Sequence, residues 1–361
     1  MRKMHIDSVP DNAILGKTIY DGNKSILLKE DSEIKPQYKK YLKRKGINSI
    51  YIKIPEIGDI EIKEPVSDKV RNESVAAVKN TMNSIKLGKN KGIILSERGK
   101  EILNVVDKII DEILSQKEIV SNVLDLKNDD DYTFQHSVNV SILSAMIGKE
   151  FNMSESLLKK MTLGAILHDI GKTKTPKHIL NKKGKLTEEE FETVKQHTSE
   201  GLKIYQESKI YDQTVGSIIY YHHERCDGSG YPEGITCEEL HNHIKIVSVA
   251  DVYDALVSSR PYRLALPSHE ALEHLLSNMN TLYDKEVLNE FIKIVAPYPI
   301  GSYVHLNDKR QGYVIKNHHG NSTRPVIRIC YEDGSLPFDS LYELDLSSPK
   351  NENILIARVE N

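Results

Sequence analysis

Seven side chains in this sequence have the types that bind metal ions, and they lie in five separate segments. Eight of the 14 histidines fall between His136 and His243, and imidazole is the commonest metal-binding side chain in proteins. The candidate ligands are five imidazoles and two carboxylates: His136, His168, Asp169, His197, His222, His223 and Asp251.

This set is larger than one tetrahedral zinc ion requires, and it matches a dinuclear site in which a carboxylate bridges two ions. Because it mixes imidazole with carboxylate and contains no thiolate, the set suits Fe, Mn or Zn. We expect Fe or Mn, with Zn, Ni or Mg as further candidates. Cys226 and Cys237 lack the CxxC spacing of a structural zinc site. A single buried histidine is more often a hydrogen-bonded core residue than a ligand. The prediction therefore depends on the whole set.

Helical patterns indicate how the chain would position these side chains. In residues 155–172, apolar residues and then His168 recur at helical spacing, so the buried face of that helix would end in His168 and Asp169. Lys172 would reach the same place, although a lysine at a helix end also has an ordinary structural role. Asp251 lies in an otherwise apolar helical segment, where an unpaired carboxylate is costly and favours a cation.

Two further segments supply three of the remaining histidines. Thr187 and Glu190 have the spacing of a capping box, and the helix that they begin would present His197 two to three turns later. His222 and His223 end an apolar run and are followed by a glycine-rich loop.

Two of these segments resemble a known family. Residues 168–172 read HDIGK and residues 222–232 read HHERCDGSGYP, which resemble the paired signatures of the HD-GYP branch of the HD metal-dependent phosphohydrolases. The resemblance runs from about residue 131 to 263 and includes YTFQHSVNV and ADVYDALVSSRPYR. It implies an enzyme that hydrolyses cyclic di-GMP.

The resemblance also implies a role for each matching position. His136, His168, Asp169 and Asp251 would bind one ion, whereas Asp169, His197, His222 and His223 would bind the other, with Asp169 as the bridge. Lys172 would contact the scissile phosphate, and Arg260 and Arg263 would hold the dinucleotide, although these arginines could also form a solvated turn. Gly228, Tyr231 and Pro232 would shape the substrate pocket or a surface for a signalling-protein partner.

One position departs from the pattern of those family members that bind a third metal. They have a glutamate four residues before the first histidine, and here that residue is Tyr132. We therefore expect two divalent ions, although Asp130 or Asp131 could supply a displaced carboxylate. Because metal number affects how far hydrolysis proceeds, the product is left open between pGpG and GMP.

The expected mechanism is attack on phosphorus by a hydroxide that bridges the two metals, with Lys172 and the metals stabilising the phosphoryl charge. Two alternatives stay open. One is a phosphodiesterase for another cyclic dinucleotide, such as cyclic GMP-AMP. The other is a non-catalytic receptor for cyclic di-GMP, which the presence of all seven ligands disfavours.

The fold class expected is multidomain and mainly α. Residues 1–65 would form a small α+β accessory module and residues 66–126 a helical connector. Residues 127–297 would form an all-α HD-type catalytic bundle, and residues 298–361 a small β appendage. Ile102, Val106, Ile109 and Ile113 have coiled-coil spacing, which fits either packing within the domain or a homodimer seam.

Composition narrows the class of protein. The 361 residues carry a formal charge of −3, which is too balanced for a surface that coats DNA or RNA. The sequence shows no signal peptide and no apolar run long enough to span a membrane, so we expect a cytoplasmic protein. The three cysteines, Cys226, Cys237 and Cys330, are expected to be reduced thiols.

Overall fold

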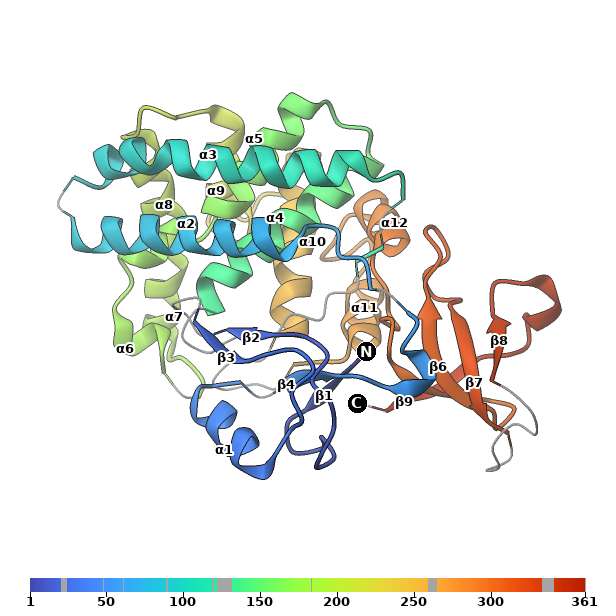
Figure 1. Ribbon diagram of the computed structural model, residues 1–361. Helices are drawn as coiled ribbons and strands as arrows, with labels where there is room; N and C mark the ends of the chain where they lie inside the picture. Colours follow the sequence, from blue (N-terminus) through green and yellow to red (C-terminus); the bar gives the residue numbers. More distant parts are fainter. Residues whose placement is uncertain are drawn as a thin grey trace.

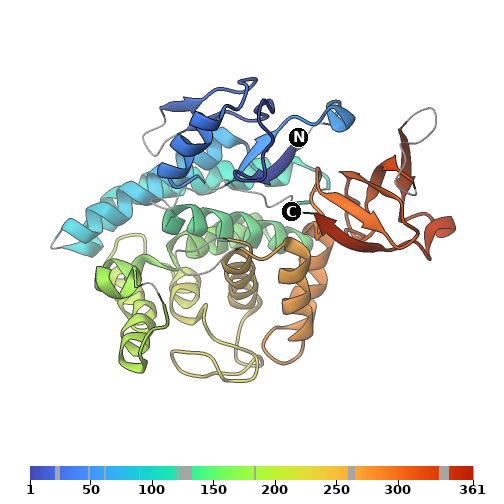
Figure 2. The same ribbon diagram turned by 90° about the horizontal axis from the view of Figure 1, so that it is seen from below.

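A helical body occupies the middle of the chain, with strands from both ends of the chain beside it (Figure 1). The computed structural model describes residues 1–20, 25–47, 49–60, 62–88, 90–118, 120–121, 132–182, 184–258, 265–332 and 341–360. Figure 2 shows the N-terminal segment in blue and the C-terminal sheet in red on adjoining sides of the helical body, with the two termini close together.

The helical body is built around α4 and α10, which pack against each other in its centre. Helices α2 and α3 form an antiparallel pair that covers one side, and α5, α8 and α9 pack next to one another on another side. Its helices are α2 (Asp68–Leu87), α3 (Lys91–Ser115), α4 (Tyr132–Glu150), α5 (Glu155–Leu167), η3 (Ile170–Thr173), α6 (Lys177–Leu180), α7 (Glu188–Lys195), α8 (His197–Gln206), α9 (Gln213–Tyr221), α10 (Asn242–Val257), α11 (Ser268–Ser277) and α12 (Lys285–Ile294).

The apolar seam of α3 packs inside its own chain. Ile102, Val106, Ile109 and Ile113 are at most 1% exposed and belong to the central hydrophobic cluster. Of the two interpretations of the coiled-coil spacing, packing within the domain is therefore the one observed, and this seam is not a free surface for a second copy. The described helices include none that combines the length and apolar character needed to cross a bilayer.

The N-terminal segment contains two small antiparallel strand pairs and one helix. β1 (Arg2–His5) pairs with β4 (Ser49–Ile52), and β2 (Ile19–Tyr20) pairs with β3 (Ile26–Leu28). α1 (Pro36–Arg44) is the α-helix of this segment, and Gly46 follows it with a φ of +75°. The described residues between η1 (Pro55–Ile57) and α2 form no strand, and Asp59 among them contacts the C-terminal sheet.

The described residues of the C-terminal segment form a five-stranded antiparallel sheet, in agreement with the predicted small β appendage. The strand order is β8-β7-β6-β5-β9, with β5 (Tyr303–Leu306), β6 (Gln311–Lys316), β7 (Val326–Tyr331), β8 (Tyr342–Asp345) and β9 (Ile356–Glu360). Ile57 of the N-terminal segment packs against Ile315 and Val326 of this sheet. An ion pair of 3.0 Å between Arg328 and Asp59 reinforces the contact.

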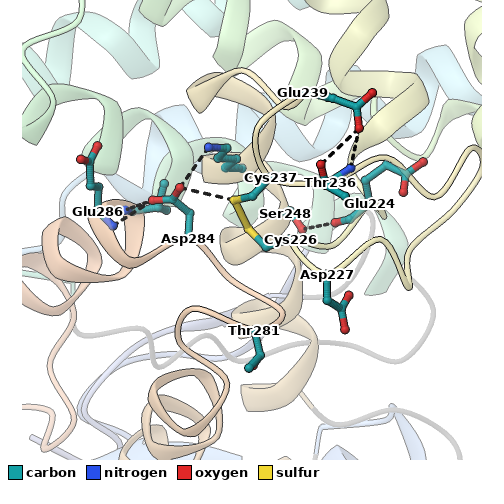
Figure 3. Close-up of a disulfide and its surroundings, with 12 residues drawn as sticks. Glu224, Cys226, Asp227, Thr236, Cys237, Glu239, Ser248, Thr281, Asp284 and Glu286 are labelled. Carbon is teal, nitrogen blue, oxygen red and sulfur yellow. Dashed lines mark hydrogen bonds and ion pairs between the residues drawn. A yellow bond between two sulfur atoms is a disulfide. The ribbon is translucent and has the colours of Figure 1, made fainter.

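The cysteines differ from the expectation. Cys226 and Cys237 form a disulfide (Figure 3), so the prediction of three reduced thiols is wrong for this pair. The loop between them doubles back, and Asp227 pairs with Thr236 in an antiparallel bridge, which brings together two cysteines 11 residues apart. Cys330 is a free, buried cysteine.

Candidate metal centre

The ends of several helices meet at one buried place. His136 lies near the start of α4, His168 and Asp169 follow α5, and Asp251 lies within α10. His197 begins α8, and His222 and His223 follow α9. The structure thus brings all seven predicted ligands together, in two groups whose ligand atoms lie within 4.8 Å of one another: His136, His168 and Asp251 in one, and Asp169, His197, His222 and His223 in the other.

Asp169 lies between the two groups. One of its carboxylate oxygens, Oδ2, is 3.3 Å from His168 Nε2 and 4.0 Å from His136 Nε2. The other, Oδ1, is 3.5 Å from His197 Nε2. Within the first group, Asp251 Oδ1 is 2.9 Å from His136 Nε2. A carboxylate with one oxygen toward each group has the geometry required of a bridging ligand.

The centre contains buried polar atoms that no neighbouring group satisfies. His168 Nε2 and Asp169 Oδ1 are both buried and have no hydrogen-bond partner among the described residues. Leaving such atoms unpaired in a protein interior costs free energy. Nitrogen and carboxylate oxygen atoms directed at a shared space are ligands that divalent transition metals accept. The donor set therefore fits divalent metal ions.

Backbone carbonyls orient three of the imidazole rings. His168 Nδ1 lies 2.7 Å from the carbonyl of Ala165, and His197 Nδ1 lies 2.7 Å from that of Val194. His222 Nδ1 contacts the carbonyl of Ile219 at 3.0 Å. Since a carbonyl only accepts, each Nδ1 carries the proton and each Nε2 keeps a lone pair for a metal.

Comparisons with known proteins agree with this geometry. Residues 118–287 match the family model of the HD domain, and residues 303–361 match that of a KOW domain associated with the HD domain. The central part of the chain is an HD domain. The family predicted from HDIGK and HHERCDGSGYP is thereby confirmed.

Named relatives of this HD domain include a cyclic di-GMP phosphodiesterase of Pseudomonas aeruginosa. It is 33% identical over 228 residues, or 63% of this chain and 55% of the relative. A cyclic di-GMP phosphodiesterase of Thermotoga maritima is 37% identical over 241 residues, which are 64% of each chain. This chain therefore spans between about half and two thirds of the length of these relatives. An HDG"Y"P protein from Bdellovibrio bacteriovorus has a similar fold, with a TM-score of 0.53 and 20% identity over 80% of this chain and 97% of that one.

One residue beside the seven ligands was not predicted from the sequence. Asp254, which is fully buried, places Oδ2 2.7 Å from His136 Nδ1. Its other oxygen accepts a 2.9 Å hydrogen bond from Asn139. Asp254 orients His136 as the carbonyls orient the other rings. The sequence did contain a signal, because Asp254 is a second carboxylate three residues after Asp251 in the same apolar helix.

Burial sets the charges of the histidines. It lowers the pKa of His197 to about 4 and of His223 to about 3, and it holds the pKa of His222 well below its ordinary value. Burial also acts to lower the pKa of His136, but hydrogen bonds to Asp251 and Asp254 raise it overall. Three of the rings are thus neutral near pH 7, which is the state that binds metal.

Lys172 and the loop that carries Gly228, Tyr231 and Pro232 lie beside the seven ligands. Lys172 Nζ is 2.6 Å from Asp169 Oδ2 and is partly exposed, so a ligand could reach it. The ring of Tyr231 lies 4.7 Å from that of His223. Gly228 has a φ of +76°, and Pro232 follows Tyr231 through a cis peptide.

Two details of the prediction turn out differently. The capping box of Thr187 and Glu190 is present, but the helix stops at Lys195 and His197 begins a new one. The new helix lies against η3, where a Cβ on Gly171 would come within 1.9 Å of the His197 carbonyl. Arg260, Arg263, Asp130 and Asp131, and the side chain of Tyr132, lie outside the described residues.

Proposed function

We propose that this protein is a metal-dependent phosphodiesterase that hydrolyses cyclic di-GMP. The observation that carries the proposal is the position of Asp169 between two groups of ligands, with the Lys172 ammonium against the same carboxylate. A pair of ions with an adjacent cation is the arrangement that phosphoryl transfer uses. The cyclic di-GMP phosphodiesterases among the relatives support the choice of substrate.

We propose His136, His168, Asp169 and Asp251 as the ligands of one ion, and Asp169, His197, His222 and His223 as those of the other. The mixture of imidazole and carboxylate ligands suits Fe, Mn or Zn, and we propose Fe or Mn. Two bound ions would lower the pKa of a water between them and neutralise charge on the phosphoryl oxygens.

The chain's own groups would bind and orient the substrate. Lys172 is close enough to the cluster to contact the scissile phosphate, and its ammonium matches the charge of a phosphoryl oxygen. The Tyr231 ring, beside His223, offers an apolar face to a nucleobase. Burial of the histidines strengthens each charge interaction at the cluster.

We also propose roles for two arginines, for the Tyr231 loop and for the terminal segments. Arg260 and Arg263 would hold the rest of the dinucleotide, and the loop with Gly228, Tyr231 and Pro232 would border the pocket or meet a signalling protein. Residues 1–65 and 298–361 would be accessory modules around the catalytic domain, with residues 66–126 as a connector.

A second substrate has specific support. A 3′3′-cGAMP-specific phosphodiesterase of Vibrio cholerae is 36% identical over 164 residues, which are 45% of this chain and 37% of the relative. The metal ligands act on phosphate groups and do not distinguish guanine from adenine.

Competition between the two dinucleotides tests both candidates. Anaerobically purified protein loaded with Mn²⁺ is given equal concentrations of cyclic di-GMP and 3′3′-cGAMP, and products are separated by chromatography. We expect pGpG or GMP from cyclic di-GMP at the higher rate, and no product from Asp169→Asn protein. Faster loss of 3′3′-cGAMP would make the second candidate correct, and loss of neither dinucleotide would refute the proposal.

A further inference from the structure

The loop that carries Tyr231 is closed at its base by two cysteines that the proposed phosphodiesterase chemistry does not use. Cys226 and Cys237 flank the loop, and their Cα atoms are 4.0 Å apart. The Cys237 amide donates to the Cys226 carbonyl at 3.2 Å. The backbone therefore holds the two side chains next to each other, and they can meet whether or not a bond joins their sulfurs.

The surroundings suit a thiol as well as a disulfide. Cys237 Sγ lies 3.5 Å from Asp284 Oδ2 (Figure 3), so a reduced Cys237 has a hydrogen-bond acceptor. Lys245 donates to the same oxygen at 3.0 Å and neutralises its charge, so this carboxylate does not oppose a thiolate on Cys237. Both cysteines are partly exposed residues.

Cys330 differs in each of these respects. It is 1% exposed, and burial raises the pKa of its thiol to about 11. A buried thiol of high pKa reacts slowly. The chain thus contains a matched internal control for the reactivity of the pair.

A metal ion at Cys226, Cys237 and Asp284 is the other chemistry that these atoms suggest, because their ligand atoms lie close together. Asp284 is already engaged, however. Its Oδ1 caps α12 by accepting from the amide of Glu286 at 2.8 Å, and its Oδ2 accepts from the Lys245 ammonium, which would repel a cation. The geometry therefore favours thiol–disulfide chemistry.

The pair is connected to the metal centre through the loop. The buried carboxylate of Glu224 accepts from the amides of Glu233 and Gly234 at 2.7 and 3.0 Å, which fixes the returning half of the loop. The Tyr231 amide donates to the His223 carbonyl at 3.3 Å. A covalent bond at the base would restrict the remaining freedom of the loop and hold Tyr231 against His223.

We propose that Cys226 and Cys237 are an oxidation site at which a low-molecular-weight disulfide converts two thiols to the disulfide and fastens the Tyr231 loop beside the histidine cluster. One protein thiolate attacks the small disulfide, forms a mixed disulfide and releases one thiol. The second protein thiolate then attacks the protein sulfur of that bond and releases the other thiol. The protein loses two electrons and the small disulfide gains them.

The thiol chemistry is tested without reference to activity. Protein reduced with dithiothreitol is incubated with oxidised glutathione, denatured, alkylated with N-ethylmaleimide and weighed by mass spectrometry. We expect three adducts before oxidation and one after it, on Cys330, and the Cys330→Ala control should change from two adducts to none. Three adducts after oxidation, a persistent glutathione adduct on one cysteine, or a bound metal ion lost in Cys226→Ser protein would overturn the proposal.

The effect on the loop is measured by hydrogen exchange. In oxidised protein, we expect amides in residues 227–236 to exchange about ten-fold more slowly than in reduced protein, with no change in α9. Double Cys226→Ser and Cys237→Ser protein should exchange at the reduced rate under both conditions. Equal exchange of the loop in oxidised and reduced wild-type protein would contradict the fastening role.

The expected effect on turnover rests on the proposed function. We expect a KM for cyclic di-GMP at least three-fold lower in oxidised protein, because an ordered loop costs less to immobilise on binding. Hydrolysis with an unchanged KM would refute the link between loop and site. A redox-dependent loop in a protein that hydrolyses neither dinucleotide would refute the proposed phosphodiesterase and leave the oxidation site intact.

Discussion

At the scale of residues, the orientation of four ligand histidines depends on their Nδ1 atoms, which face away from the metal centre. His168, His197 and His222 each use Nδ1 on a backbone carbonyl, so their orientation follows from the helix ends on which they lie. His136 differs, because a side chain, Asp254, holds its Nδ1. A side chain can be replaced without disturbing the backbone, which makes this contact testable.

Replacing Asp254 with asparagine keeps the shape of the side chain and removes its charge. Loss of such a contact to a ligand histidine typically costs 10–100-fold in metal affinity. We expect a loss of that size in Mn²⁺ affinity, measured by titration of metal-free protein. Asp107→Asn is the control, since Asp107 is half exposed and pairs with Lys159 on the surface, away from the ligands. Equal affinity in Asp254→Asn and wild-type protein would show that Asp254 does not support the centre.

Lys172 gives a second prediction at this scale. If its ammonium stabilises phosphoryl charge, Lys172→Met should reduce kcat by about 10²–10³-fold and leave metal content unchanged. The matched control is Lys174→Met, because Lys174 is two residues away and half exposed. Its ion pair with Glu200 is long, at 4.0 Å. An equal loss in both variants, or loss of metal from the Lys172 variant, would exclude a role in substrate binding.

At the scale of elements, the helical patterns explain why the sequence was informative about the site. The ligands lie in or next to helices whose apolar periodicity is a local pattern, so His168, Asp169 and Asp251 could be placed from sequence. The break before His197 could not, because no local pattern marks it; it lies where Gly171, from a different segment, comes close to the His197 carbonyl. Strands β1 and β8 likewise depend on pairing with a partner strand, which a local pattern does not reveal.

At Gly171, a single added Cβ atom would disturb the packing of η3 against α8. A Cβ there would lie 1.9 Å from the His197 carbonyl, so Gly171→Ala must push η3 away from α8. We expect a destabilisation of about 1–3 kcal/mol or more, measured by urea unfolding, together with loss of metal binding. Gly58→Ala is the control, because its nearest contact would be an ordinary 3.5 Å. Normal stability and metal content in Gly171→Ala would contradict this packing.

At the scale of the whole molecule, the terminal segments stabilise each other. Ile57 is fully buried against the C-terminal sheet, and Arg328 of that sheet pairs with Asp59. Arg2 of β1 also donates to the carbonyl of Glu360 in β9 at 3.2 Å. Because these contacts join residues from opposite ends of the chain, no local sequence pattern could predict them.

Ile57→Ala tests this connection. Truncating a buried isoleucine to alanine typically costs 2–5 kcal/mol, and we expect amides of both β4 and β7 to exchange hydrogen faster as a result. Ile93→Ala, at a position that is 55% exposed, should have no such effect. Faster exchange in β4 alone would show that the two ends are independent.

The buried histidines also make stability depend on pH. Folding lowers the pKa of His197, His222 and His223 below that of an unfolded histidine, which is about 6.5. As the pH falls, the unfolded chain therefore binds protons that the folded chain does not bind. Stability is therefore complete above about pH 6.5 and falls as the pH drops toward 4. The raised pKa of His136 opposes this, since its stabilisation is complete below pH 6.5 and is lost at higher pH.

Three histidines outweigh one, so metal-free protein should be less stable at pH 5 than at pH 7. Below about pH 6.5, each histidine that is neutral in the folded chain and protonated in the unfolded chain lowers the free energy of unfolding by about 1.4 kcal/mol per pH unit as the pH falls. Urea unfolding at the two pH values measures the difference. Equal or greater stability at pH 5 would show that the rings are not held neutral.

The most direct test of the central claim is a titration of metal-free protein with Mn²⁺ under anaerobic conditions, with cyclic di-GMP hydrolysis and bound metal measured at each step. Asp169 lies between two groups of ligands, so we predict that hydrolysis follows occupancy of the second site and reaches its maximum at two ions per chain. Full activity with one ion per chain, or two bound ions without hydrolysis of any cyclic dinucleotide, would contradict a dinuclear phosphodiesterase.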